Sequence, residues 1–469
     1  MSARPFPSLF SQTAERCRSD HRPLLQHLEE RRLLDSSLPI IGESPAASAS
    51  SAVSDSQSDS PDPRAAQGEE IDIVLGDINA RRLLFTDSVG TRVSILHRVG
   101  TATIHLTGDD LQQTTGRRDV ELSGGNIRIV SITYADTSFH SRTIIRTSGT
   151  GDGVTSLETI TGNGPVGKLL APTTSLTGAG IVMTGTGVIA SITLADLENG
   201  ADIVMPGNGP PRGINLHFDL INAGTDISLV SDIRSLKADS WLDGTLTATQ
   251  ARSINISGNV SGDWSLTTGG ARSITLGGSV LSGTWDFTGT LRRLNARRDF
   301  AADLTATSYR VIKIGGDFTG SITATAGGGR VIRKMTVNGS TEDAAVATVG
   351  DIHKLIFHEI TNLSIYAGAP QPVPGDWING LPSTTGDLVR DSVVDSLIVR
   401  GSATGATFVA QTFKRISMQD INSGDTFHMA AQNVRNASMR IDNQRYKFRN
   451  NQIFAEAPDL PYLDFNQLA

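Results

Sequence analysis

The sequence predicts an all-β fold, a parallel β-helix (β-solenoid) with about 20 residues per coil, and three observations support this prediction. Pairs of apolar residues at positions x and x+2 recur along much of the chain at a nearly constant spacing. Glycine is abundant, with 48 residues, whereas tyrosine and tryptophan number 5 and 4. The body is rich in Ser, Thr, Ile, Val and Leu, which is typical of short strands separated by frequent turns.

The apolar pairs define the repeat. They are Ile192/Leu194, Ile214/Leu216, Leu236/Ala238, Ile254/Ile256, Ile274/Leu276, Leu294/Ala296, Ile312/Ile314, Met335/Val337 and Leu355/Phe357, and the pattern resumes at Leu397/Val399, Ile416/Met418 and Ala437/Met439. The first nine pairs are separated by 22, 22, 18, 20, 20, 18, 23 and 20 residues. Self-similarity with this period indicates stacked repeats. Because the spacing varies, it favours a right-handed β-helix over a strict 18-residue hexapeptide helix.

Further apolar residues follow each pair. In one coil they are Val260, Trp264 and Leu266, with Gly258 and Gly262 between them. No period of 3.6 residues fills these intervals, which excludes the helical half of a leucine-rich repeat. We therefore expect two or three short strands per coil, with these residues facing inward, and a rod on the order of 70 Å long if about fifteen coils stack at the strand spacing.

Composition divides the chain into segments. We expect a basic N-terminal segment at 1–42, a disordered linker at 43–70, a β-rich N-terminal unit at 71–148, the β-helix at 149–442 with an excursion at 368–392, and a C-terminal cap at 443–469. The linker is mostly Ser, Ala, Asp and Pro, and it cannot bury enough apolar surface to offset the entropy of ordering. The β-rich unit is either a small sandwich or the first irregular coils of the rod.

Charge and targeting signals narrow the functional classes. The formal net charge is −7, so no overall positive field attracts nucleic acid or anionic membranes, and we expect neither as a partner. No run of 18 apolar residues occurs, and the first forty residues lack the apolar core of a conventional signal peptide. The single cysteine, Cys17, excludes an intrachain disulfide and is interpreted as an incidental thiol. We expect no cofactor.

One resemblance suggests where such a protein acts. The segment Leu28–Ser36, LEERRLLDS, resembles the N-terminal LEPR-type motif of many large bacterial surface and secreted repeat proteins, with glutamate in place of the proline. Phe85–Val93 is similar to the family's F-x-D-x-D-G-D-x-V strand opening, and Ile312–Ile322 to its V-x-V-G-G-D-V-x-G-S-I coils. The resemblance implies export, an extracellular or cell-surface location and no enzymatic activity. Val89 and Thr91 stand where the family pattern has acidic residues, so the resemblance does not extend to a calcium site at these positions.

A column of basic residues is the most specific unusual feature. Two positions before the apolar pairs stand Arg212, Arg234, Arg252, Arg272, Arg292, Arg310 and Arg333, followed by His353, Lys414 and Arg435. Stacked one coil apart, such cations repel one another by about 1 kcal/mol even in water. The simpler interpretation is that each guanidinium caps turn carbonyls and stacks on its neighbour. The functional interpretation is a binding strip for an acidic polysaccharide, whose carboxylates or sulfates accept forked hydrogen bonds.

A second polar column stands five positions after x. It consists of Asp219, Asn259, Ser279, Asp299, Asp317 and Ser340. Asp, Asn and Ser suit tight turns, so we predict a ladder of turn residues. The carboxylates are interrupted in most coils, and the sequence contains no calcium-binding repeat, so we do not predict a calcium site.

An enzymatic interpretation stays open as the alternative. A β-helix lyase or hydrolase needs paired carboxylates or an acidic metal cluster. Asp109-Asp110 resembles one fragment of the pectin-hydrolase pattern, but the companion strings are absent, and we interpret the pair as a turn. The nine histidines lack metal-binding spacing. Trp377, in the proline-rich excursion, either stacks on a sugar ring or packs against the rod.

These observations predict a non-enzymatic, exported structural or adhesive repeat protein of the bacterial cell surface, with an acidic polysaccharide as the candidate partner of the arginine column. Two alternatives remain: a β-helix carbohydrate-active enzyme, and an intracellular polymerising scaffold, which the missing signal peptide leaves open. The oligomeric state is not predicted.

Overall fold

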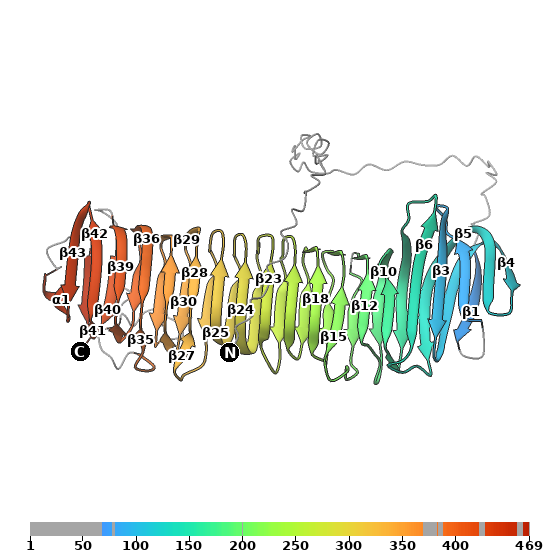
Figure 1. Cartoon of the computed structure of the whole chain (residues 1–469), viewed down its shortest axis with the longest axis horizontal. Coiled ribbons are helices and arrows are strands. Elements are labelled where there is room, and N and C mark those ends of the chain that lie inside the picture. The colour runs from blue at the N-terminus through green and yellow to red at the C-terminus, as the bar shows by residue number, and fades with distance from the viewer. Residues whose placement is uncertain are drawn as a thin grey trace, which may run out of the picture. The chain divides into compact units, whose positions relative to one another are not determined.

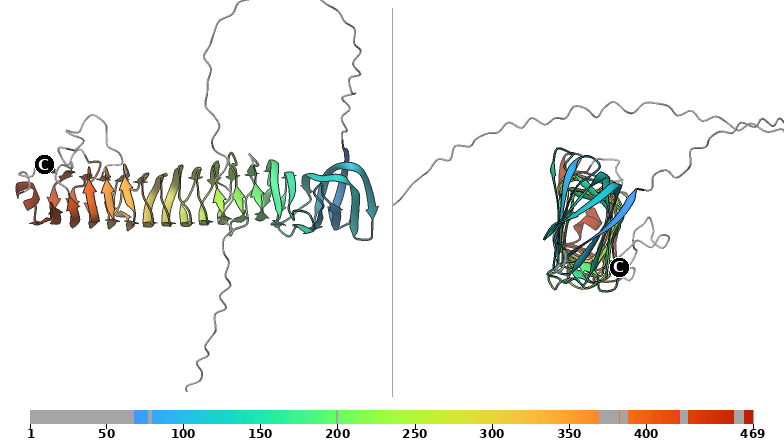
Figure 2. Two further views of the ribbon diagram at one scale, coloured as in Figure 1. Left: turned by 90° about the horizontal axis from the view of Figure 1, so that it is seen from above. Right: turned by 90° about the vertical axis from the view of Figure 1, so that its right-hand side faces the viewer.

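The computed structural model confirms the predicted fold class. The chain is 64% strand and 1% helix, and it forms a β-solenoid of about 13 turns with ~21 residues per turn (Figure 1). The structure describes residues 68–76, 80–198, 200–368, 382, 388–421, 427–456 and 463–468. Seen along the rod, the coils superimpose into a flattened tube (Figure 2). The handedness stays a prediction.

The first sheet runs the length of the rod and carries the apolar pairs. It is built by in-register parallel pairing of successive coils. Its strands are β9 (Lys168–Ala171), β12 (Ser191–Leu194), β15 (Ile214–His217), β18 (Ile233–Ala238), β21 (Ala251–Ile256), β23 (Ala271–Leu276), the second halves of β24 (Thr284–Ala296) and β25 (Asp303–Ile314), β28 (Met335–Val337), β32 (Leu355–Phe357), β36 (Leu397–Thr404), β39 (Ile416–Ile421) and β42 (Asn436–Ile441).

The second sheet stacks the later part of each coil, also in parallel. Its strands are β7 (Thr155–Gly162), β10 (Thr174–Met183), β14 (Ile203–Met205), β17 (Ile227–Leu229), β20 (Thr245–Ala248), β22 (Asp263–Leu266), the first halves of β24 and β25, β26 (Ser321–Ala324), β30 (Ala345–Thr348), β34 (Ser364–Ala367), β37 (Thr407–Val409), β40 (Phe427–Ala431) and β44 (Leu463–Gln467).

Short strands turn the chain between these two sheets. They are β8 (Pro165–Val166), β11 (Val188–Ile189), β13 (Asp196–Leu197), β16 (Leu220–Ile221), β19 (Ser240–Trp241), β27 (Arg330–Ile332), β29 (Ser340–Glu342), β31 (Asp351–Ile352), β33 (Glu359–Thr361), β35 (Val393–Val394), β38 (Thr412–Phe413) and β41 (Asn433–Val434). Isolated parallel bridges continue the β19 corner through Val260, Val280, Phe300 and Phe318. Each coil therefore turns its corners at the same places, which keeps both sheets in register.

The N-terminal strands start the rod in an antiparallel arrangement. These strands are β1 (Glu69–Gly76), β2 (Arg82–Thr86), β3 (Thr91–Arg98), β4 (Thr101–Thr115), β5 (Asp119–Ala135) and β6 (Arg142–Gly149). β1 pairs antiparallel with β4 and β4 with β5, whereas β5 pairs parallel with β7 and so joins the second sheet. One apolar core runs from here through the coils, and residues 66–469 form one compact unit. The described part of 71–148 therefore shares the core of the rod but pairs largely antiparallel. Which of the two expected forms it takes, a small sandwich or irregular first coils, stays a prediction.

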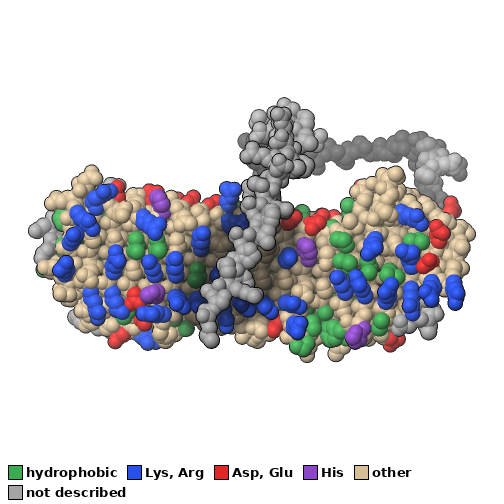
Figure 3. Space-filling view, in the orientation of Figure 1, with side chains coloured by type: hydrophobic (Ala, Val, Ile, Leu, Met, Phe, Trp, Pro, Cys, Tyr) green, Lys and Arg blue, Asp and Glu red, His purple; other side chains and the backbone are tan. Residues whose placement is uncertain are grey.

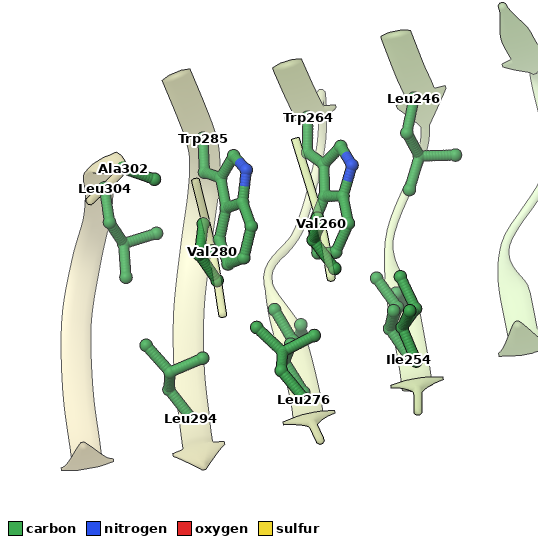
Figure 4. Packing of buried hydrophobic residues seen from close by; sticks show 14 of the residues in the cluster. Leu246, Ile254, Val260, Trp264, Leu276, Val280, Trp285, Leu294, Ala302 and Leu304 are labelled. Carbon is green, nitrogen blue, oxygen red and sulfur yellow. The ribbon is translucent and has the colours of Figure 1, made fainter. Parts of the chain in front are cut away.

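A ladder of large aromatic side chains fills the centre of the rod. Trp241, Trp264, Trp285, Phe300 and Phe318 come from successive coils and are all fully buried. The rings of Trp264 and Trp285 are stacked, with centroids 4.1 Å apart (Figure 4). Trp285 also meets Phe300 edge-on, with centroids 5.4 Å apart. Trp264 lies inward as its position in the repeat predicts. Parallel pairing places Trp264 on Trp285 and, in a neighbouring column at the β19 corner, Phe300 on Phe318. Rings of the two columns also meet, as Trp241 does with Trp264 and Trp285 with Phe300.

The coils on either side of the predicted excursion stack directly on each other. Leu355 pairs with Leu397, and Ser364 with Thr407, although each pair is separated by more than forty residues of chain. The segment between them is therefore an insertion at one turn, and the repeat continues across it. At the C-terminal end β43 (Gln444–Arg449) pairs antiparallel with β42, and the short helix α1 (Gln452–Glu456) follows.

One part of the predicted register is wrong. Leu216 pairs with Ile192 and with Leu236, so Leu216, and not Ile214, occupies position x in its coil. The reason is a turn before β15 that adds residues to this coil. Gly213 has a φ of 82°, in the left-handed region that favours glycine, and a Cβ there would meet the backbone oxygen of Asp232 at 2.7 Å. A register shift follows directly after Ile214.

The aromatic ladder gives a first prediction. Trp264→Ala would leave a cavity between Leu246 and Trp285, its partners in the adjoining coils, and we expect it to lower the local unfolding free energy by about 3–5 kcal/mol. Hydrogen exchange of the amides in β20, β22 and β24 measures this loss. Ser265→Ala, the adjacent half-exposed position, is the matched control and should change protection little. Equal exchange in both variants would contradict the central role of the ladder.

Candidate functional site

Six arginines form a column in exact register along the first sheet. The pairings Leu236–Ile254, Ile254–Ile274 and Ile274–Leu294 place the arginine two residues before each of them in adjacent coils. The same pairing continues through Ile312 and Met335. We call the resulting column the arginine strip, and it consists of Arg234, Arg252, Arg272, Arg292, Arg310 and Arg333. All six side chains are exposed.

The seventh predicted member, Arg212, does not belong to the strip. Because Leu216 is the register residue of its coil, Arg212 stands four residues before it instead of two. Arg212 nevertheless lines the same hollow as Arg234 and Arg252, so its charge adds to this end of the strip. The same shift removes Asp219 from its predicted column, since Leu220 and not Asp219 pairs with Ser240.

The strip lies along two adjoining hollows in the surface. One, of about 740 Å³, is lined by Arg212, Arg234, Arg252, Arg272 and Arg292 among others. The other, of about 730 Å³, is lined by Arg272, Ser273, Arg292, Arg293, Arg310, Val311, Arg333, Lys334, His353 and Lys354. The two hollows share Arg272 and Arg292 and are therefore continuous. Rows of Lys and Arg side chains are visible along the face of the rod in Figure 3.

A second, shorter row of cations stands beside the strip. Arg293, Lys334 and Lys354 each follow directly after the basic residue of their coil and line the same hollow. Sequence reasoning overlooked this row because serine or valine occupies the position in the coils between, at Ser273 and Val311. Positive charge is therefore densest over the coils from residue 292 to residue 354.

The strip arginines have no internal partners. Throughout the described residues, none of the six guanidinium groups forms a salt bridge or a side-chain hydrogen bond; the arginine side chains that do so are Arg330, Arg440 and Arg445. Capping of turn carbonyls, the simpler interpretation, therefore does not account for the column. Six cations one coil apart, at about 4.8 Å, repel one another and attract an external anion.

The column changes character where an acidic residue enters it. Leu397 pairs with Leu355 and with Ile416, so Asp395 stands in the column between His353 and Lys414. Asp395 accepts hydrogen bonds from His353 Nδ1 at 2.7 Å and Lys414 Nζ at 2.6 Å, and Arg330 lies 3.1 Å away. Partial burial alone would raise the pKa of Asp395, but these hydrogen bonds and the Lys414 and Arg330 charges outweigh it and lower that pKa.

No family model, curated protein or solved structure matches the chain. The site is therefore interpreted from its own geometry. None of the described helices is long and apolar enough to cross a membrane.

The second polar column is a ladder of turns, as predicted. Asn259 Oδ1 accepts from the backbone N–H of Ser279 at 3.0 Å, Asp299 from Asp317 at 3.0 Å, and Asp317 from Ser340 at 2.7 Å. Each side chain thus bonds the backbone of an adjoining coil. A similar ladder, unnoticed in the sequence, runs through Asp202, Asp226, Thr245, Asp263, Thr284, Asp303 and Ser321. Among the described residues no three His, Cys, Asp or Glu converge as metal ligands.

The residues that line the hollows include no pair of carboxylates, which the alternative of a carbohydrate-active enzyme would need. Asp232 is the one acidic residue that lines them, and its carboxylate accepts a hydrogen bond from Gln250 Nε2 at 2.8 Å. The interpretation of Asp109-Asp110 as a turn is wrong, because both residues lie within β4, at an irregularity of its pairing with β5. Asp110 has a φ of 50° there, and Asp109 accepts a hydrogen bond from Asn126 Nδ2. A hydrolase that works through two carboxylates would need them across a cleft.

Several predicted features lie outside the described residues. These are the basic segment 1–42 with its LEPR-like motif Leu28–Ser36 and with Cys17, all but the last three residues of the linker 43–70, and Trp377, the candidate for sugar stacking. Within the described strip the lining residues include no Phe, Tyr or Trp. The charged groups available there for contacts with an anion are guanidinium and ammonium groups, with hydroxyl, amide and imidazole side chains beside them.

The Asp395 cluster gives a prediction of pH dependence. A carboxyl whose folded pKa is lowered contributes stability that is present above its unfolded pKa, about 3.9, and lost as the pH falls through the folded value. Asp395→Asn leaves Arg330, His353 and Lys414 without their anion, so we expect a lower melting temperature than wild type at pH 6 and above.

Thermal melts of both proteins from pH 7 down to pH 2 measure this difference. It should shrink steadily below about pH 4 and vanish at the acid end. Asp391→Asn, at an exposed position nearby, is the control and should melt like wild type throughout. A gap between wild type and Asp395→Asn that is constant with pH would show that the cluster does not act through charge.

Proposed function

We propose that this protein is a non-catalytic structural or adhesive rod that binds an extended acidic polysaccharide along the arginine strip. The observation that carries the proposal is the stack of six exposed arginines, which have no acidic partner among the residues that the structure describes. Where the column does contain an acid, at Asp395, the neighbouring cations all engage it. The uncompensated strip is therefore the part of the column left for an anion from outside.

The geometry favours a linear ligand with repeated charges. The strip repeats at the strand spacing of about 4.8 Å, so it spans about 24 Å from the first arginine to the sixth. A polymer with a carboxylate or sulfate on each unit can follow that line, and a guanidinium can grip each group through two hydrogen bonds. A single small anion would use only one or two of the six.

The chemistry of the strip favours a polysaccharide over single-stranded nucleic acid. Proteins that bind single strands combine cations with aromatic rings on which the bases stack. The lining of the hollows includes no Phe, Tyr or Trp side chain. A location at the bacterial cell surface is part of the proposal, and it is supported by the LEPR-type resemblance described above.

The binding experiment uses the full chain and three glycans: a polyuronate, a sulfated polysaccharide and a neutral glucan. We expect binding of the two anionic polymers that weakens steeply with salt, and no binding of the glucan. Arg272→Glu, Arg292→Glu and Arg310→Glu combined should weaken binding by at least ~100-fold, since each charge-assisted contact contributes about 1.5 kcal/mol. The slope of log K against log salt should fall by about 2–3.

The matched control reverses three exposed arginines away from the strip, Arg81, Arg117 and Arg118, with the same change in net charge. Affinity that falls equally in both triple variants would show a response to net charge, and unchanged affinity in the strip variant would refute the strip. Release of shortened or unsaturated products from any polymer would support the enzymatic alternative instead.

A further inference from the structure

Each end of the solenoid carries a strand that has one edge unpaired within the described residues. Within the described residues β1 pairs with β4 alone, and β43 pairs with β42 alone. These strands lie at opposite ends of the rod (Figure 1). An unpaired strand edge is a template for pairing with another chain, and β1 and β43 are long enough, at eight and six residues, to form a ladder.

The two edges carry opposite charges. On β1 the exposed side chains include Glu70 and Asp72, and on β43 they include Arg445, Lys447 and Arg449. Two β1 edges, or two β43 edges, would place like charges opposite each other, which destabilises a strand pair. A β1 edge and a β43 edge attract. The charges therefore oppose pairing of like ends and favour pairing of unlike ends.

The direction of the strands fixes how they would meet. β1 is antiparallel to β4 and β4 to β5, and β5 is parallel to β7, so β1 runs in the direction of the coils. β43 is antiparallel to β42 and so runs against it. Rotation of one copy about the rod axis does not change the sense in which its strands run around that axis. β43 ends the first sheet and β1 ends the second, so two rods stacked head to tail bring β43 and β1 together as an antiparallel pair when one rod is turned about the rod axis until these two sheets align.

One register of that pair matches both faces of the strands. If Asp72 stands opposite Lys447, then Glu70 stands opposite Arg449, and Ile73 opposite Tyr446 on the inner face. Ile73 is buried, and Tyr446 is partly buried and packs against the end of the core. The ladder would therefore join opposite charges on the outside and place Ile73 beside Tyr446 on the inside, next to α1, whose Ile453 is buried in the same core.

His105 of β4 already contacts the two acids of this edge. Its Nδ1 lies 2.8 Å from Asp72, and its Nε2 lies 3.8 Å from Glu70. A carboxylate has two oxygens and about four lone-pair sites, so each acid can accept from a partner strand as well. The contact with His105 holds both side chains at the edge.

The geometry points to a second binding surface, for another copy of this chain: β43 of one rod pairs antiparallel with β1 of the next. Such a contact uses two different surfaces, so it does not close on itself, and it generates an open filament. Pairing of exposed backbone groups supplies affinity, and the charge pattern supplies polarity. The oligomeric state, which the sequence leaves undecided, is then a head-to-tail polymer.

Assembly is separable from polysaccharide binding. The strip belongs to the first sheet, and β1 extends the second sheet through β4, β5 and β7. No strip arginine takes part in the end contact. The variant with three reversed strip arginines is therefore expected to assemble like wild type, which distinguishes failure of one proposal from failure of the other.

Two charge-reversed variants of the full chain test the contact. Arg445→Glu, Lys447→Glu and Arg449→Glu combined make both ends acidic, and Glu70→Lys with Asp72→Lys makes both ends basic. Sedimentation velocity and electron microscopy at low salt should show concentration-dependent fibres for wild type and monomers for each variant alone. An equimolar mixture of the variants should form fibres again, because each acidic end then meets a basic one.

Several outcomes would overturn the proposal. These are a wild-type chain that stays monomeric at every concentration, a variant that assembles alone as wild type does, and a mixture of folded variants that does not assemble. Circular dichroism verifies the folding of each variant. Should a variant not fold, the salt dependence of wild type decides: fibres must shorten between 0.05 and 0.5 M salt, as screening weakens attraction between the ends, and fibre length that ignores salt refutes the charge pairing.

Discussion

Parallel, in-register pairing of successive coils is the constraint on which the other features of this molecule depend. It repeats every position of the sequence at about 4.8 Å along the rod. Inside, the repetition produces the aromatic ladder in which Trp264 and Trp285 stack. At the turns it lets Asp299 bond the backbone of the next coil. On the outside it brings arginines together that repel one another, and this arrangement persists because the backbone ladder and core determine the spacing.

The fold could be predicted from the regular spacing of the apolar residues and from the residue types at the turns. Local irregularities in the coils could not be predicted in this way. The x and x+2 pairs identified the first sheet, and the later apolar positions, such as Trp264, identified the inward face. Arg212 was misplaced because the left-handed turn at Gly213 shifts the register before β15, and spacing alone cannot distinguish a lengthened turn from a lengthened strand. The insertion hid Asp395 in the same way, since 42 residues separate it from His353.

The candidate site was predicted in part. All six strip arginines were identified from the sequence, because each stands two residues before an apolar pair. The adjoining row at Arg293, Lys334 and Lys354 has no such regularity and emerges only when the hollow is seen. The sequence also does not show that the strip arginines lack partners among the described residues. An acidic residue from any coil could have paired with them, as Asp395 does with His353 and Lys414. Similarly, the charges of β1 and β43 acquire meaning only once these strands are known to be edges.

The two proposed activities, polysaccharide binding and assembly, both follow from the solenoid architecture. A solenoid presents a repeated surface along its length and two distinct surfaces at its ends. In this chain the length carries uncompensated positive charge, and the ends carry opposite charges on unpaired strands. A rod of this design can hold a linear polyanion along its side and extend itself by adding copies, and the two activities use different residues.

The most direct test of the central claim is the dependence of affinity on ligand length. Calorimetry with size-fractionated acidic oligosaccharides should show affinity rising with each added unit until the ligand spans the six arginines, about 24 Å, and levelling off beyond that length. Affinity that is the same for a disaccharide and for a long chain, or that continues to rise far beyond this span, would contradict a strip of six arginines as the binding site.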